Sequence, residues 1–192
     1  MTRASDADAA LVVAATATLD RHVLAASRAL CDRAFHGSGP DDGFDDDDWA
    51  HALGGLHVLA RDGEGAVIGH AAVVRRVVDA GGTPWRCGYV EAVAVAPDHQ
   101  GRGVGSAVMA VASQLVRDGH DLGVLGTGRT GFYARLGWEP WRGTSWVRDP
   151  GTSRLRRTAE DDDALMVLRH GRSAGLDLRG PLVARARPGD DW

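Results

Sequence analysis

The chain has 192 residues, of which 44% are hydrophobic and 25% charged, a balance typical of one soluble globular domain. The formal net charge of -4 argues against binding to the phosphate backbone of nucleic acid. All 22 basic residues are arginine, so no lysine is present to form a Schiff base or act as an amine nucleophile. We therefore expect a single domain over residues 1–192 and no nucleic-acid partner.

The chain has two cysteines, Cys31 and Cys87. Two isolated cysteines make neither a zinc pattern nor a disulfide framework. We interpret them as free core thiols in a reducing compartment, and we expect no metal site.

An apolar run near the start, residues 9–19, is too short to span a membrane. A signal peptide is the competing interpretation because Arg3 precedes the run, but Asp6 and Asp8 occupy the place of a basic n-region. We favour a first strand at residues 11–19, in a cytoplasmic protein without a membrane partner.

Hydrophobic periodicity and turn residues predict the remaining elements. The stretch 90–96 is apolar apart from Glu91, which indicates a central strand covered on both faces. A strand, a crossover helix and a further strand should be parallel and right-handed. The other expected strands are 56–61, 66–78, 85–96, 122–126, 138–146 and 164–169, the expected helices are 20–35, 45–53, 104–118 and 130–136, and residues 170–192 have no assigned structure.

A glycine-rich loop, Gln100-Gly101-Arg102-Gly103-Val104-Gly105, leads from the apolar strand into the amphipathic helix. Three glycines let the backbone approach a ligand, and the helix N-terminus favours a pyrophosphate. Arg102 adds a candidate charge-assisted contact. By itself such a loop is a weak signal, more often a tight turn, and it matches neither the Walker nor the dinucleotide pattern.

The order of two motifs makes the loop specific. Gln100, Gly103 and Gly105 match Gln/Arg-x-x-Gly-x-Gly/Ala, and Tyr133, Gly137 and Trp138 match a later Tyr-x-x-x-Gly-aromatic pattern. This order resembles the acetyl-CoA signature of the GNAT superfamily of N-acetyltransferases. The resemblance implies an α/β (α+β) fold with a central mixed, mostly antiparallel sheet, a parallel splayed strand pair and flanking helices.

The resemblance also implies how acetyl-CoA is bound. Free backbone groups of Val93 and Val95, with Ala94 between them, would pair with the pantetheine amides as an added strand does. The pyrophosphate would lie on the glycine-rich loop, so the expected cofactor-binding residues there are Gln100, Gly101, Arg102, Gly103, Val104 and Gly105.

Acetyl transfer to an amine needs a neutral nucleophile and a protonated leaving thiolate. Glu91 is the candidate general base, acting through water, because burial in an apolar strand should raise its pKa. A structural carboxylate is the alternative. Tyr133 is the candidate general acid, and a packing tyrosine is the alternative.

Acidic clusters at residues 41–48, 160–163 and 190–191 are most simply solvated loops, although they would also suit a polycationic acceptor.

The segments 49–57, 86–95 and 136–141 and the ending Gly-Asp-Asp-Trp resemble the aminoglycoside 2'-N-acetyltransferases. That resemblance implies antibiotic resistance, a homodimer, and a C-terminal carboxylate on Trp192 that reaches the site as a catalytic group. The implied acceptor-binding residues are Asp42, Glu91, Ala92, Gly126, Glu160, Asp161, Asp162, Asp190 and Trp192.

Two alternatives stay open. The first is a GNAT enzyme that acts on another small polyamine or amino sugar. The second is a non-catalytic acyl-CoA-binding module, against which the presence of both Glu91 and Tyr133 argues.

Overall fold

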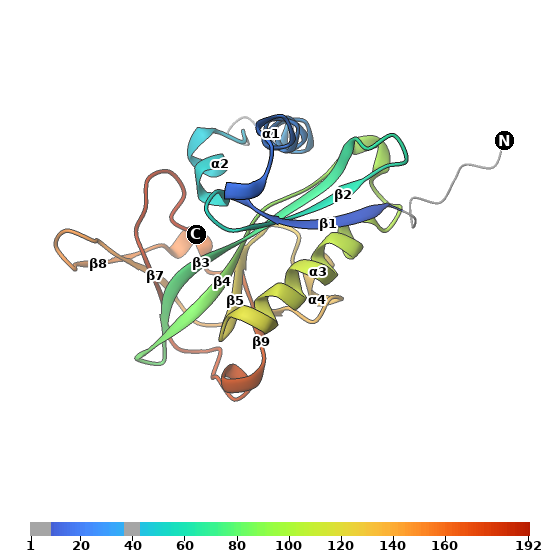
Figure 1. The fold of residues 1–192 in the computed structure, drawn as a ribbon. Coiled ribbons are helices and arrows are strands. Elements are labelled where there is room, and N and C mark those ends of the chain that lie inside the picture. The colour runs from blue at the N-terminus through green and yellow to red at the C-terminus, as the bar shows by residue number, and fades with distance from the viewer. Residues whose placement is uncertain (1–8, 37–42) are drawn as a thin grey trace. The chain divides into compact units, whose positions relative to one another are not determined.

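The computed structural model describes residues 9–36 and 43–192 (Figure 1). Their contacts group into two compact units, each described here by itself. Unit 1 contains the described residues up to Val74 together with residues 90–112, and unit 2 contains residues 75–89 and 113–192. The expectation of one domain stays a prediction. Asp42 and the charged residues before the first strand lie outside the described residues.

Unit 1 is built on strands β1 (Ala10–Ala15), β2 (Leu56–Arg61) and the first part of β3 (Val67–Ala80). Each neighbouring pair is antiparallel, and the hairpin predicted between β2 and β3 is confirmed. The first strand ends earlier than predicted because the Thr16 amide donates to the Gly55 carbonyl at 3.0 Å and the chain enters the 3₁₀ turn η2 (Thr16–Thr18).

Two helices in unit 1 begin at acidic caps, as expected for unpaired amides at a helix start. Helix α1 (Arg21–Phe35) begins after Asp20, whose carboxylate accepts from the His22 amide at 2.7 Å. Helix α2 (Asp46–Ala52) begins with a reciprocal capping box between Asp45 and Asp48. Both helices were predicted from the sequence, and both are confirmed.

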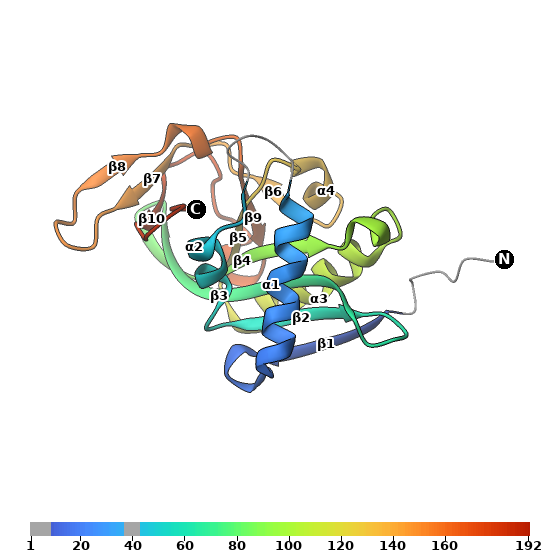
Figure 2. The ribbon, with the colours of Figure 1, turned by 90° about the horizontal axis from the view of Figure 1, so that it is seen from above.

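The sheet of unit 1 is covered on both faces. Helices α1 and α2 lie on one face, and the start of α3 (Val104–Gly119) lies on the other (Figures 1 and 2). Neighbouring residues of β3 show this alternation: Cys31 of α1 approaches His70, whereas Val104 and Val108 of α3 pack over Gly69.

Unit 2 is an extended mixed sheet with strand order β6-β9-β5-β4-β3-β10-β7-β8. The pairs β4–β5 and β7–β10 are parallel, while β3–β10, β5–β9, β6–β9 and β7–β8 are antiparallel. This confirms the expected mixed sheet with a parallel pair. The strands are β4 (Thr83–Val95, of which residues 90–95 belong to unit 1), β5 (Leu122–Gly126), β6 (Glu139–Pro140), β7 (Ser145–Arg148), β8 (Leu155–Arg157), β9 (Leu165–Arg169) and β10 (Leu182–Arg185).

The predicted strand at residues 138–146 is wrong as a single element. It divides into β6 and β7 because the intervening amides bond elsewhere, Trp141 to the Leu165 carbonyl and Arg142 to the Leu178 carbonyl. Gly143 lies against the loop before β10, where an added Cβ would come within 1.9 Å of the Gly180 oxygen.

The remaining differences are smaller. Helix α3 continues through Gly119, and the short helix α4 (Thr130–Ala134) ends two residues earlier than predicted. Strands β8 and β10 and the turns η3 (Pro97–His99), η4 (Ala159–Asp161) and η5 (Gly171–Ser173) were not predicted.

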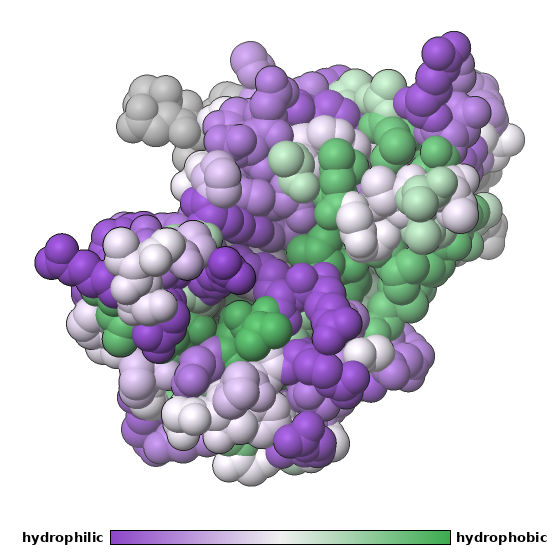
Figure 3. Space-filling view, turned by 60° about the vertical axis from the view of Figure 1, so that its left-hand side comes forward, coloured by the Kyte–Doolittle hydropathy of each residue, from purple (hydrophilic) through white to green (hydrophobic). Residues whose placement is uncertain are grey.

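Neither cysteine forms a disulfide and both are buried, as predicted. Within the described ranges, no helix is long and apolar enough to cross a membrane. Hydrophilic residues predominate on the face drawn in Figure 3, and hydrophobic residues gather in a few areas of it. The large apolar side chains that stay exposed include Leu11, Val12 and Val13 of β1.

Gly69 allows α3 to pack closely on β3, so a side chain there should destabilise the protein. A Cβ would lie 2.7 Å from a Val104 methyl group and 3.1 Å from the Ala60 Cβ. We expect Gly69→Ala to lower the free energy of unfolding by about 1–3 kcal/mol, measured by denaturant titration. Gly63→Ala is the matched control, because nothing lies within 4 Å of its added Cβ. Equal stability of the two variants would contradict this account.

Candidate active site

The glycine-rich loop of unit 1 has the backbone that a closely bound ligand requires. Gly101 and Gly103 have φ angles of +73° and +91°, a region that other residues rarely adopt. The Gln100 side-chain amide donates to the Val95 carbonyl at 3.2 Å and ties the loop to the end of β4. Val104 is buried, whereas the loop from Gln100 to Gly103 is exposed, so its backbone is open to a ligand.

Strand β4 is distorted next to the candidate base. Ala92 has a φ of +52°, one of two non-glycine residues with a positive φ in the described part of the chain. Glu91, Val93 and Val95 are half-buried, and Ala94 is buried. The parallel pairing of β4 with β5 covers the residues from Cys87↔Leu122 to Tyr89↔Val124. Left-handed residues in strands often lie at functional sites.

Tyr133, the candidate acid, belongs to α4 of unit 2 and is 7% exposed. Burial raises the pKa of Tyr133 to about 12, while a hydrogen bond with the Thr127 side chain and the charge of Arg129 oppose the rise. At neutral pH the hydroxyl therefore keeps its proton and is available as a donor. Thr127 follows β5 directly, so this strand positions the phenol.

The last residues of unit 2 are anchored by a buried polar network. The Trp192 indole, in a residue only 5% exposed, donates to the Thr158 hydroxyl at 2.9 Å. That hydroxyl donates in turn to Ser145 at 2.9 Å. Asp162 accepts from the Ser145 amide at 2.8 Å and is paired with the Arg157 guanidinium. The hydrogen bonds from Arg157 are the main reason why the pKa of Asp162 falls to about 2.

Asp161, the neighbouring residue, has the opposite electrostatic environment. Burial, followed by the negative charge of Asp190, raises its pKa to about 6, and Glu160 and Asp191 contribute in the same direction. Asp190 itself is exposed and accepts from the Trp192 amide at 3.2 Å. Asp161, Asp190 and Glu160, here called the acidic cluster, therefore concentrate negative charge in unit 2.

Gly126, at the end of β5, lies close to the other candidate acceptor-binding groups of unit 2. A Cβ at Gly126 would lie 3.6 Å from the Tyr89 hydroxyl and 3.9 Å from the main-chain carboxyl carbon of Trp192. The guanidinium groups of Arg76 and Arg187 lie over the Tyr89 ring, 4.7 and 5.5 Å from its centre.

The structure thus groups the predicted site residues into two sets. Unit 1 holds the loop from Gln100 to Gly105 and the strand residues from Glu91 to Val95. Unit 2 holds Tyr133, Gly126, the acidic cluster, Asp162 and Trp192. In the described ranges no group of three or more His, Cys, Asp or Glu side chains is arranged to hold a metal ion.

Sequence reasoning missed Thr158 and Tyr89. Thr158 is buried in an otherwise exposed stretch, and no periodic pattern marks it. Tyr89 lies in the segment that resembles the aminoglycoside enzymes, directly before Val90-Glu91, but was given no role. Its position as the only aromatic residue between Arg86 and Ala96 is the signal that was available.

Comparison with known families identifies the class of protein that this fold and loop represent. The family model described as "Acetyltransferase (GNAT) domain" matches residues 18–141. The chain therefore belongs to the GNAT family of acetyltransferases. It is also 41% identical, over 92% of its length and 89% of the relative's, to an aminoglycoside 2'-N-acetyltransferase of Mycolicibacterium fortuitum.

Solved structures share the fold. The GNAT family N-acetyltransferase YhbS from Escherichia coli, solved in complex with CoA, superposes with a TM-score of 0.64 at 22% identity and covers 92% of this chain and 89% of its own. A GNAT family acetyltransferase from Brucella melitensis, in complex with acetyl-CoA, has a TM-score of 0.60 at 20% identity, with 87% of this chain and 92% of its own covered.

The charge of Asp190 helps to keep Asp161 protonated, so its removal should lower the pKa of Asp161. In the wild-type protein we expect the Asp161 carboxyl to titrate near 6, followed by carbon-detected NMR of the carboxyl groups. Asp190→Asn should shift that midpoint to lower pH, because a like charge near a carboxylate disfavours ionisation. Because the folded pKa is raised, the contribution of Asp161 to stability is full below about 4 and is lost as pH rises through about 6.

Asp163→Asn is the matched control for this titration. Asp163 is exposed, and its charge is not among the causes of the Asp161 shift. An equal shift in both variants would show that the effect comes from net charge and not from the acidic cluster.

Proposed function

We propose that this chain transfers the acetyl group of acetyl-CoA to the 2'-amino group of aminoglycosides and thereby confers resistance. The observation that carries the proposal is the 41% identity, over 92% of the chain, to a relative with that name. Acetylation removes a positive charge from the drug. A cytoplasmic location and a homodimer belong to the same proposal and rest on the family resemblance alone.

The proposed donor site is the loop from Gln100 to Gly105 together with β4. The left-handed Gly101 and Gly103 support a backbone that approaches a pyrophosphate closely, next to the N-terminus of α3. Val93 and Val95 would offer backbone groups to the pantetheine amides. The CoA and acetyl-CoA complexes of structural relatives support this choice of donor.

The proposed acceptor site is the acidic cluster with Gly126 and Trp192. A polycation would be attracted by the clustered carboxylates, and its charge would favour the ionised form of Asp161. The family resemblance assigns to Trp192 a carboxylate that would bind a further ammonium group. Asp162 would act indirectly, because its pairing with Arg157 and Ser145 shapes the loop that carries Asp161.

In the proposed mechanism both substrates are bound together and react directly. Glu91, through a water molecule, removes a proton from the acceptor ammonium, and the neutral amine attacks the thioester carbonyl carbon. As the carbon–sulfur bond breaks, the Tyr133 hydroxyl gives its proton to the departing thiolate, and the nitrogen loses its second proton to solvent, from which Tyr133 later regains one. The products are the acetylated amine and CoA. A Tyr133 pKa of about 12 leaves the hydroxyl protonated throughout the neutral range.

The deciding experiment compares two aminoglycosides that differ only in a 2'-amine or a 2'-hydroxyl group. We expect the purified protein to release free thiol from acetyl-CoA with the first and not with the second. Turnover with both would keep the acetyltransferase and contradict the 2' assignment. If neither reacts but a polyamine or amino sugar does, the acceptor class is different. Tight acetyl-CoA binding with no turnover on any amine would indicate a binding module.

Tyr133→Phe tests the proposed acid. The substitution keeps the ring and removes only the proton donor, so kcat should fall by about 10²–10⁴-fold while the acceptor KM changes little. Steady-state thiol release measures both constants. Phe132→Leu, on the same short helix, is the control for disturbed packing and should leave kcat within a few fold. A kcat for Tyr133→Phe equal to that of the control would rule out the acid role.

A further inference from the structure

Unit 1 contains two fully buried histidines that none of the proposed steps uses. His57 on β2 and His70 on β3 are each 0% exposed, and each is the one polar side chain among the buried residues of its strand. Their rings are joined by a 2.9 Å contact between His57 Nδ1 and His70 Nε2. The outer nitrogens are also engaged, His57 Nε2 with Thr16 Oγ1 at 2.8 Å and His70 Nδ1 with the Ala92 carbonyl at 2.7 Å.

Four groups, Thr16, His57, His70 and Ala92, are joined by this series of hydrogen bonds. Which atom donates and which accepts in each bond follows from the Ala92 carbonyl at the end of the series. The Ala92 carbonyl can only accept, so His70 Nδ1 carries a proton and donates it. His70 Nε2, in the neutral ring, must then accept from His57 Nδ1–H. His57 Nε2 is left as an acceptor for the Thr16 hydroxyl, which itself accepts from the Gly54 amide at 2.9 Å. With both rings neutral, the Thr16 hydroxyl must donate to His57 Nε2 at 2.8 Å and not to the Gly55 carbonyl, which lies 3.3 Å away, and both rings hold their proton on Nδ1.

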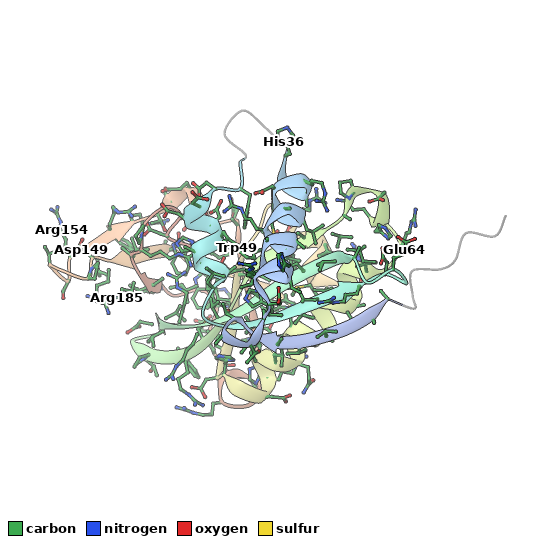
Figure 4. The ribbon with its side chains drawn as sticks, turned by 45° about the horizontal axis from the view of Figure 1, so that its top comes forward. His36, Trp49, Glu64, Asp149, Arg154 and Arg185 are labelled. Atoms are coloured by element: carbon green, nitrogen blue, oxygen red, sulfur yellow. The ribbon has the colours of Figure 1, made fainter. Side chains whose placement is uncertain are left out.

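Burial supports the neutral state of both rings. Desolvation lowers the pKa of His57, and it lowers the pKa of His70 to about 4 despite the hydrogen bond to Ala92. The Trp49 ring, which projects from α2 toward β2 and β3 (Figure 4), lies 6.2 Å from the His57 ring and 5.7 Å from the His70 ring. Cys31 Sγ lies 3.9 Å from both His70 Nδ1 and the Ala92 oxygen.

The series of hydrogen bonds ends at Ala92, the one residue in the described part of β4 whose backbone is left-handed. Ala92 has a φ of +52° and directly follows Glu91, the candidate base. An alanine adopts this conformation only where its surroundings hold it. The bond from His70 fixes the carbonyl of this residue, and so the orientation of the peptide between Ala92 and Val93.

We propose that His70, oriented by His57 and Thr16, is a positioning residue that holds Ala92 in its left-handed conformation and so fixes the direction of Glu91. The role of Glu91 as base rests on the proposed function, whereas the role of His70 toward Ala92 rests on geometry alone. His57 and Thr16 select the His70 ring nitrogen that carries the proton. Thr16 thus acts on Glu91 through the rings of His57 and His70 and through the peptide of Ala92.

The first test is spectroscopic and needs no substrate. Nitrogen-15 NMR of imidazole-labelled protein should show both His57 and His70 as neutral Nδ1–H tautomers, the form that free histidine disfavours. The Ala92 carbon shifts should report a left-handed backbone. An Nε2–H tautomer at His70, or an ordinary extended Ala92, would overturn the proposal even if the enzyme acetylates aminoglycosides.

The second test uses two isosteres that divide the functions of His70. Asparagine places its amide nitrogen near the position of Nδ1 and can still donate to Ala92, whereas glutamine reaches only the position of Nε2. We expect His70→Gln to lose the left-handed Ala92 signal and to lower kcat at least tenfold. His70→Asn should keep the signal and most of the activity. His22→Gln, an exposed histidine on α1, is the control and should change neither.

The two variants also separate this inference from a folding defect. Both remove the same ring from the same buried site, so a merely structural role predicts similar losses of melting temperature and activity. Equal activity of His70→Asn and His70→Gln, whether high or low, would contradict positioning. If no acceptor is turned over, the Ala92 signal in the two variants still decides whether His70 holds the peptide.

Discussion

The left-handed backbone of Ala92 is the constraint on which the candidate site depends. A left-handed conformation costs a non-glycine residue about 1–2 kcal/mol, so it persists only where neighbouring bonds hold it. In unit 1 the His70 ring bonds the Ala92 carbonyl at 2.7 Å, and the Ala96 amide donates to the Ile68 carbonyl at 2.9 Å further along β4. Between these two bonds the strand must leave its regular pleat. The glycine-rich loop then follows, tied back to β4 by Gln100.

The same histidine rings account for the place where the first strand ends. A polar ring buried at 0% exposure is tolerated only with both nitrogens bonded. Thr16 supplies the last bond through its hydroxyl, while its amide donates to the Gly55 carbonyl at 3.0 Å. The first strand therefore ends after Ala15 because the buried His57 ring needs the Thr16 hydroxyl as its hydrogen-bond partner.

The sequence predicted the elements whose signal is local and missed those whose cause is distant. Amphipathic periodicity located α1 and α3, and acidic residues in the first turn located α2. Strand β10 has no comparable signal, because it forms by pairing with β7 and β3, which lie far away in the sequence. The glycine-rich loop was found from its spacing. The different environments of Asp161 and Asp162 were not, because they depend on Arg157 and on burial, which spacing does not encode.

Asp161 and Asp162 are neighbours in sequence, but their pKa values shift in opposite directions because Arg157 pairs with Asp162. The planar guanidinium of Arg157 binds Asp162 through both oxygens, and Arg156 pairs with Asp191, so these acids are held in place. Burial is the main cause of the raised pKa of Asp161, and the negative charges of Asp190, Glu160 and Asp191 add to it. A cation bound beside Asp161 would favour its ionised form and lower its pKa. Binding of a polycationic acceptor below pH 6 would then release a proton, so acceptor affinity and the charge of Asp161 are thermodynamically linked.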